Sequence, residues 1–208
     1  MRKWTVGTLS VVLGALAACG RATKSGSETE AASDAAEAAG GTGGTMTSDA
    51  AALAAAAAAR RDWRVTPDGI GMIQTGWTSA RVSTALRTTV KPSYRDTPGC
   101  TQLHVPGMPD GTLLMFVADT LMRVDVTKGG VRTPEGVGVG DAEAKVVRLY
   151  AGRAKVEPHK YTGPTGHYVT VTPPDDTLHR IIFETDGKTV LNYRAGRRPA
   201  VEYVEGCN

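Results

Sequence analysis

The sequence has no proline in its first 60 residues and no aromatic residue between residues 20 and 60, whereas all 11 prolines come later. A stretch rich in alanine, glycine and serine offers too little apolar surface to offset the entropy lost on ordering. It predicts a flexible tether over residues 19–60, with a short helix over residues 48–61, where Ser48 or Asp49 precedes a run of alanines. The remaining residues, 62–208, have the size of one globular domain.

The sequence also lacks an excess of charge of one sign. Its 24 lysines and arginines nearly balance its 21 aspartates and glutamates, for a net charge of +3. Arg2 and Lys3 supply part of that small excess. Because domains that bind nucleic acid carry a strongly basic face, the composition predicts no nucleic-acid partner.

Motifs of common catalytic and nucleotide-binding sites are missing as well. The domain contains Ser79, Ser83 and Ser93, and none of them lies in the Gly-x-Ser-x-Gly turn of α/β-hydrolases. The stretch "GVGVGD", residues 136–141, begins like a dinucleotide-binding loop, but Asp141 stands where glycine is needed and would repel a pyrophosphate. No Gly-Lys-Ser/Thr triplet closes this loop. The sequence therefore predicts neither a nucleotide cofactor nor an enzyme.

The N-terminus resembles that of bacterial lipoproteins. A short basic region precedes an apolar run over residues 4–18, which is too short to span a bilayer comfortably. The run ends in Leu-Ala-Ala-Cys, residues 16–19, which resembles the lipobox where such precursors are cleaved and lipidated. The resemblance implies a signal peptide over residues 1–18 and a lipid with acyl chains such as palmitate on Cys19. An ordinary secretory signal with a chance cysteine is the alternative.

The residue after this cysteine bears on localisation. Gly20 stands where aspartate would signal retention at the inner membrane of Gram-negative bacteria. By the same resemblance, we expect an exported protein that is anchored in the outer membrane through its lipid and faces the periplasm. A Gram-positive source would instead place it on the outer face of the plasma membrane.

Two further cysteines fit an exported protein. If Cys19 carries lipid, Cys100 and Cys207 remain as an even pair in an oxidising compartment. They predict a disulfide bond between the middle of the domain and its end, and two free thiols are the alternative.

An internal similarity divides the domain. "VTPDGIG", residues 65–71, reappears as "RTPEGVG", residues 132–138, and "MFVADTLMRVDV" from Met115 aligns with "IFETDGKTVLNYRA" from Ile182. The only two phenylalanines of the sequence, Phe116 and Phe183, fall opposite each other in this alignment. The similarity predicts two repeats, over about residues 66–127 and 133–197.

Each repeat has a recognisable local pattern. A short helix follows the glycine turn, with Thr78 as its cap in the first repeat and Asp141 in the second. Antiparallel strands then follow, with hairpin turns at Asp119-Thr120 and at "DGK". We therefore expect an α+β fold of two tandem repeats, each a short helix followed by antiparallel strands, sharing one core. "AVEYVEGC", residues 200–207, is expected to form a last strand.

The repeat pattern resembles the SmpA/OmlA lipoproteins of outer-membrane barrel assembly and the β-lactamase-inhibitory proteins. The first repeat matches their shared motif at Gly76, Thr78, Val82 and Leu86, and the second matches at Gly140, Val146, Leu149 and Gly152. Trp77 and Arg81 depart from the motif in the first repeat, as do Asp141 and Lys145 in the second. The resemblance implies an architecture but no particular partner.

The loop over residues 157–168 is the densest polar cluster in the sequence. We select five of its residues as candidate binding residues: His159, Lys160, Tyr161, His167 and Tyr168. Glu157 with the two histidines could in principle bind zinc, but their spacing matches no common ligand pattern, and we expect neither a metal nor another cofactor.

These observations favour one function over two others. We expect a lipid-anchored, non-catalytic binding or scaffold module of the cell envelope, with an envelope protein or a glycan as partner. The first alternative is an inhibitor or a carbohydrate-binding module that uses the 157–168 loop or an open sheet face. The second is an envelope hydrolase with an atypical site, which would need a deep pocket with converging polar groups.

Overall fold

The structure is a computed structural model that describes residues 50, 52, 62–94 and 99–207. The predicted signal peptide, Cys19 and nearly all of the predicted tether lie outside the described residues, and so does the helix predicted over residues 48–61, apart from Ala50 and Ala52, which are helical. No helix of the described ranges is long and apolar enough to cross a membrane. In chain order the elements are β1 (Val65–Thr66), β2 (Gly69–Ile70), β3 (Ile73–Gln74), α2 (Ser79–Leu86), β4 (Cys100–Leu103), β5 (Thr112–Val117), β6 (Thr120–Val126), α3 (Glu143–Leu149), β7 (Ala154–Pro158), β8 (His167–Val171), β9 (His179–Thr185), β10 (Val190–Arg197) and the 3₁₀ helix η1 (Ala200–Glu202).

The strands form two antiparallel sheets. The small sheet has the order β1-β2-β3, and the large sheet has seven strands in the order β4-β5-β6-β10-β9-β8-β7. The expected α+β fold of two helix-and-strand repeats is therefore wrong, because the described chain is predominantly β, with only two short α-helices.

The excess of strand has a physical explanation. The strands of the small sheet are two residues long and lie around glycine turns, so they are too short to show an alternating pattern. β4 and β7 are the edges of the large sheet. All four residues of β4 are half-buried and most of β7 is exposed, so neither edge strand alternates between apolar and polar residues.

Both predicted hairpins form, although the turn of the first lies one residue earlier than predicted. β5 and β6 are joined by Ala118 and Asp119, whose φ angles of 45° and 62° produce a two-residue turn that suits the twist of the strands. The carboxylate of Asp186 accepts hydrogen bonds from the backbone N–H groups of Lys188 and Thr189 at 2.9 and 2.7 Å, which fixes the turn between β9 and β10.

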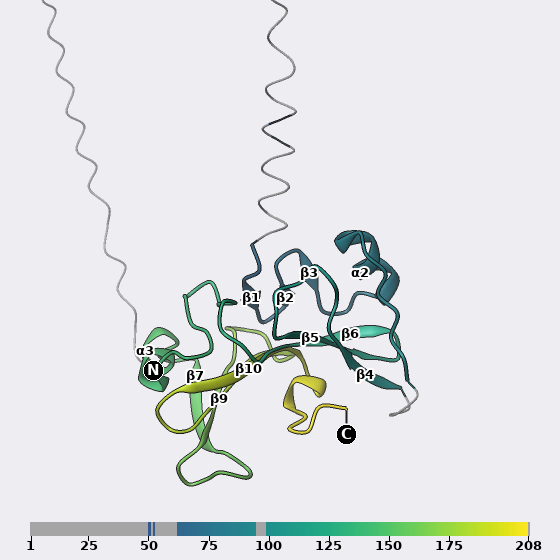
Figure 1. Ribbon diagram of the computed structural model, residues 1–208. Coiled ribbons are helices and arrows are strands. Elements are labelled where there is room, and N and C mark those ends of the chain that lie inside the picture. The colour runs from purple at the N-terminus through teal and green to yellow at the C-terminus, as the bar shows by residue number, and fades with distance from the viewer. Residues whose placement is uncertain (1–49, 51, 53–61, 95–98, 208) are drawn as a thin grey trace, which may run out of the picture. The chain divides into compact units, whose positions relative to one another are not determined.

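The hydrophobic core lies on one face of the large sheet, and α2 and the small sheet cover that face in Figure 1. Val82 of α2 and Val146 of α3 are buried in the same cluster as Phe116 of β5 and Phe183 of β9. Phe183 packs between two tyrosines, with ring centroids 5.9 Å from Tyr150 and 5.2 Å from Tyr193. Large side chains from several elements thus hold both sheets and both helices together.

The two helices begin differently. The Thr78 hydroxyl accepts a hydrogen bond from the backbone N–H of Arg81, which confirms the predicted cap of α2. The predicted cap of α3 is wrong, because its N-cap is Ala142 and no side chain caps it. The Asp141 carboxylate turns back instead, accepting from the backbone N–H of Gly138 at 2.8 Å and pairing with Arg132 at 2.6 Å.

The C-terminal segment, residues 198–207, does not form the predicted last strand. It contains η1 followed by turns, and it packs against β6, β9 and β10 on the sheet face opposite the core, which we call the outer face (Figure 1). Ala200 and Val201 are both buried. Burial of two consecutive side chains does not fit the period of two that a half-buried strand requires.

Candidate binding surface on the outer face

An ion pair is buried at the centre of the outer face. Arg123 and Asp125 of β6 are 4% and 8% exposed, and the guanidinium donates to the carboxylate from Nε at 2.8 Å and from Nη2 at 2.6 Å. The side-chain amide of Gln102 on β4 donates to the same carboxylate at 2.9 Å. Both charges lie on this face because Val124 and Val126, the alternate residues of β6, are part of the core.

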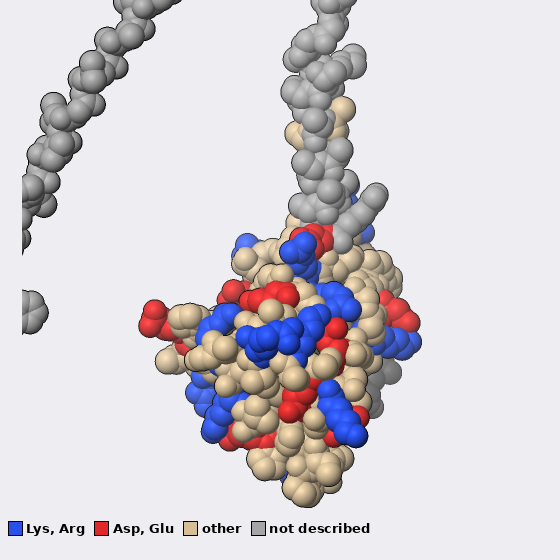
Figure 2. Space-filling model, turned by 90° about the vertical axis from the view of Figure 1, so that its left-hand side faces the viewer, with Lys and Arg blue, Asp and Glu red and all other residues tan. Residues whose placement is uncertain are grey.

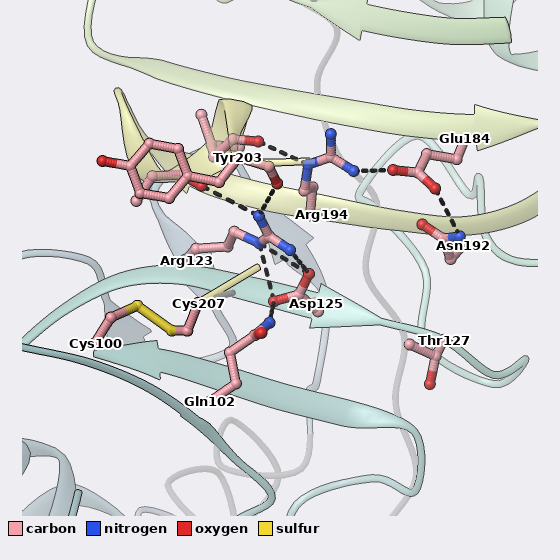
Figure 3. A network of polar contacts seen from close by, with 12 residues as sticks. Cys100, Gln102, Arg123, Asp125, Thr127, Glu184, Asn192, Arg194, Tyr203 and Cys207 are labelled. Carbon is pink, nitrogen blue, oxygen red and sulfur yellow. Dashed lines mark hydrogen bonds and ion pairs between the residues drawn. A yellow bond between two sulfur atoms is a disulfide. The ribbon is translucent and has the colours of Figure 1, made fainter. Parts of the chain in front are cut away.

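A second buried arginine lies beside this pair, as Figure 3 shows. Arg194 of β10 is 3% exposed and pairs with the carboxylate of Glu184 on β9. The amide of Asn192 donates to that carboxylate at 3.0 Å. Burial by itself would raise the pKa of Glu184, but the attraction of Arg194 and the two hydrogen bonds outweigh it, so the pKa is lowered.

Both arginines bind the C-terminal segment through its backbone. Arg123 Nη1 donates to the carbonyl oxygens of Ala200 and Tyr203 at 3.2 and 2.6 Å, and Arg194 Nε donates to that of Val201 at 2.7 Å. Hydrogen bonds from charged donors are stronger than those between neutral groups. The segment therefore has a fixed path across the sheet centre, so this part of the outer face is covered and not open.

The predicted disulfide is confirmed. Cys100 of β4 and Cys207 are bonded, with their Cα atoms 5.5 Å apart. The bond fastens the end of the C-terminal segment to an edge of the sheet. Gly206 leaves the space needed there, because a Cβ at its position would lie 2.2 Å from the Gln102 side-chain oxygen.

The tip of the β7–β8 hairpin, residues 159–166, brings a histidine to the same face. The His159 ring stacks on that of Tyr168, with centroids 4.4 Å apart, and its Nε2 lies 3.6 Å from the Glu184 carboxylate. Its Nδ1 accepts hydrogen bonds from the backbone N–H groups of Tyr161 and Thr162 at 3.1 and 3.3 Å. A neutral ring that accepts at Nδ1 carries its proton on Nε2, which here faces a carboxylate.

A groove lies between this tip and the C-terminal segment. Its volume is about 420 Å³, and it is lined by Cys100, Lys160, Tyr203, Val204, Glu205, Gly206 and Cys207. The Tyr161 hydroxyl donates to the Glu205 carboxylate, and Lys160 Nζ lies 3.6 Å from it. Together these two contacts lower the pKa of Glu205. The groove thus has a charged pair and aromatic rings at its rim.

Four of the five predicted binding residues meet at this surface, and His167 does not. His159 and Tyr168 stack against each other, while Lys160 lies 5.0 Å from the centroid of the Tyr161 ring. His167 instead faces the core side of β8, where its Nδ1 is 2.9 Å from the Glu143 carboxylate of α3. The placement of His167 in the binding cluster is therefore corrected.

The three residues considered for zinc do not lie together either. Glu157 pairs with Lys155 at 2.7 Å, whereas the two histidines contact different carboxylates on opposite faces of the sheet. A different set, Asp68, Asp176 and His179, brings its ligand-type atoms within 4.8 Å of one another. His179 Nδ1 hydrogen-bonds to Asp176 at 2.8 Å, which accounts for this approach without an ion.

Three participants in the surface were not identified from the sequence. Glu184 directly follows buried residues of β9. Its position in the sequence of the strand predicts an ordinary carboxylate that faces solvent. Tyr203 and Glu205 lie in the segment expected to be a strand. Their role depends on the path of that segment over the sheet, for which the local sequence carries no signal.

The acid stability of the protein should depend on Glu184. Because folding lowers its pKa, the group stabilises the fold fully above its unfolded pKa of about 4.3, and this contribution is lost as the pH falls through the folded value. Urea unfolding between pH 7 and pH 3 should show a steeper loss of stability for the natural protein than for Glu184→Gln. Parallel pH profiles for the two proteins would contradict this expectation.

Charges of both signs are interspersed on the face of the molecule in Figure 2, which therefore presents no extended surface of one sign. The polar groups of the candidate surface are likewise paired, as Arg194 with Glu184 and Lys160 with Glu205. Such a surface suits recognition by shape, stacking and hydrogen bonds more than attraction of a highly charged partner.

Comparisons with protein-family models, with curated proteins and with solved structures found no match to this chain.

Proposed function

We propose that this chain is a lipid-anchored lipoprotein of the cell envelope whose folded part is a non-catalytic binding or scaffold module. The lipobox-like sequence around Cys19 supports the anchor, and Gly20 favours the outer membrane facing the periplasm. The disulfide suits an oxidising compartment, since such bonds are rare in the cytosol. The exposed position of the groove supports recognition of a partner without chemistry.

The groove is the observation that carries the binding role. Tyr161 and Tyr203 are 57% and 42% exposed; Tyr203 lines the groove, and Tyr161 donates to Glu205, which also lines it. Exposed tyrosines with fixed polar neighbours are favoured at recognition surfaces because they offer both apolar area and hydrogen bonds. The disulfide and the buried arginines fix one wall in advance, which reduces the entropy lost on binding.

A glycan is the second candidate for the partner, as in a carbohydrate-binding module. Sugar rings present C–H faces that pack on aromatic rings, and hydroxyl groups that need both donors and acceptors. Tyr161 offers such a ring, Lys160 supplies donors and Glu205 supplies acceptors within one rim. An inhibitor would use the same rim to bind a protein, so the experiment below distinguishes the two partners.

The binding role is tested with the full-length protein in detergent. We expect Tyr161→Ala to weaken capture of envelope partners, or binding to isolated cell-wall glycan, at least tenfold. Leu191→Ala is the matched control, because Leu191 is 52% exposed but neither lines the groove nor bonds to a lining residue, whereas the Tyr161 hydroxyl donates to Glu205. Binding that depends on glycan would favour the carbohydrate-binding function, and binding that survives its removal would favour a protein partner. Equal binding by the natural protein, Tyr161→Ala and Leu191→Ala would contradict the proposed surface.

The anchor is tested separately. Mass spectrometry of the natural protein should show an acylated Cys19 as the new N-terminus, and Cys19→Ala should move the protein from the membrane fraction to the soluble fraction. A natural protein without acyl chains would contradict the anchor but leave the binding experiment unaffected.

A further inference from the structure

A second pocket lies where the small sheet meets the ends of β9 and β10, and it shares no lining residue with the groove. Its volume is about 250 Å³. It is lined by Asp68 from the β1–β2 turn, Gln74 and Thr75 at the end of β3, His179 at the start of β9 and Arg197 at the end of β10. Sites for drug-sized ligands measure roughly 300–1,000 Å³, so an occupant of this pocket would be smaller.

The pocket contains donors that the described protein does not satisfy. The Nε of Arg197 and the hydroxyl of Thr75 are buried, and neither has a hydrogen-bond partner among the described residues. They are two of the three such side-chain atoms in the described part of the chain, and both belong to residues that line this one pocket. Because buried polar groups in native proteins are nearly always partnered, these two atoms indicate a partner from outside the chain.

The local backbone holds these donors in place. Gly76, with a φ of 88°, leaves room for the guanidinium, because a Cβ at its position would lie 2.8 Å from Arg197 Nη1. The backbone N–H of Thr75 donates to the carbonyl of Asp68 at 2.7 Å and so joins the two sides of the β1–β3 turn region.

Negative charge gathers around His179, where Asp68 lines the pocket and Asp176 lies outside the lining. His179 Nδ1 lies 2.8 Å from Asp176 and 3.6 Å from Asp68. Hydrogen bonds from the backbone and side chain of His179 and from the backbone of Leu178 lower the pKa of Asp176 to about 2, so this carboxylate is ionised at neutral pH. One histidine is thus shared by two carboxylates, and Asp68 is 64% exposed and accessible to a further positive group.

We propose that this pocket binds a free α-amino acid, whose carboxylate accepts hydrogen bonds from Arg197 and Thr75 and whose ammonium group donates to Asp68. A simple anion would satisfy Arg197 but would be repelled by Asp68 and Asp176, and a simple cation would be repelled by Arg197. A zwitterion with both charges a few ångströms apart complements both sets. This site is independent of the groove and of the binding role proposed for it.

The experiment is a calorimetric titration of the full-length protein in detergent with glycine and with alanine, beside acetate, methylamine, phosphate and zinc chloride. We expect glycine or alanine to bind at least tenfold more tightly than acetate or methylamine. Arg197→Gln and Asp68→Asn should each weaken amino-acid binding at least tenfold. Arg198→Gln is the matched control, because that arginine adjoins Arg197 but pairs with Glu202 at 2.6 Å. Circular dichroism checks that each variant is folded.

Each other outcome would overturn the proposal. Acetate or phosphate binding as tightly as glycine would make the pocket a simple anion site. Zinc binding that Asp68→Asn abolishes and Arg197→Gln does not would make it a metal site on Asp68, Asp176 and His179. No heat of binding with either amino acid would show that the pocket is not an amino-acid site.

Discussion

Arg123→Met is expected to lower the free energy of unfolding by about 3–5 kcal/mol, the usual effect of removing one partner of a buried ion pair. The variant leaves the Asp125 carboxylate 8% exposed with the Gln102 amide as its remaining described side-chain partner. A buried carboxylate without a counter-charge must either stay ionised at a high cost or take up a proton. Urea unfolding followed by circular dichroism at pH 7 measures the loss.

A double substitution provides the control for this result. Arg123→Met combined with Asp125→Leu removes both charges and leaves no buried ion, so we expect it to recover a large part of the lost stability. A single variant within about 1 kcal/mol of the natural protein would contradict the expectation, because it would mean that the pair is not desolvated as its burial indicates.

Hydrogen exchange separates the second role of Arg123 from the first. Both variants remove the donor to the carbonyl oxygens of Ala200 and Tyr203, so both should loosen η1. The backbone N–H groups of Glu202 and Tyr203, which donate within this turn, should therefore exchange faster in both proteins. Faster exchange in the single variant alone would show that the unpaired Asp125 charge, and not the loss of the Arg123 donor, loosens the segment.

The parts of the fold that could be predicted depend on neighbours in the sequence. The β5–β6 and β9–β10 hairpins follow from turn residues between alternating strands, and the cap of α2 follows from Thr78. Val169 and Val171 alternate with polar residues along β8, and both are buried. The core can thus be located from local patterns, because each of these strands has one apolar face.

The parts that could not be predicted depend on distant partners. Arg123 and Tyr203 are 80 residues apart, and nothing near either residue indicates that they meet. Arginines in "MRVDV" and "NYRAG" have the spacing of ordinary solvent-facing charges, so the local pattern places them in water. Their burial results from the C-terminal segment, which covers the face that the strands alone would leave exposed.

The composition of the loop predicted the clustering of four candidate residues, but not the separate position of His167. The cluster of tyrosine, lysine and histidine in the loop predicted that these residues lie together, and four of them do so at the outer face. His167, however, shares the parity of Val169 and Val171 on β8, so a strand that buries those valines turns His167 to the core side as well. The alternation already present in the sequence could have excluded it.

Cys100→Ser combined with Cys207→Ser is expected to destabilise the protein by about 2–5 kcal/mol. The bonded residues are 107 apart in sequence, and closing so long a loop removes much of the freedom of the unfolded chain. The natural protein without reductant should unfold at a higher urea concentration than the variant, and reductant should abolish the difference. Equal unfolding midpoints without reductant would contradict the expectation.

The disulfide should matter more for the groove than for the sheet. Cys100, Gly206 and Cys207 line the groove, whereas Arg123 and Arg194 hold residues 200–203 without help from the disulfide. In the serine variant we therefore expect fast hydrogen exchange over residues 204–207 but continued protection of Tyr203. Because Glu205 lies in the loosened part, partner capture should weaken at least as much as with Tyr161→Ala. Full capture by a variant with this loosened end would show that the groove wall does not contribute to binding.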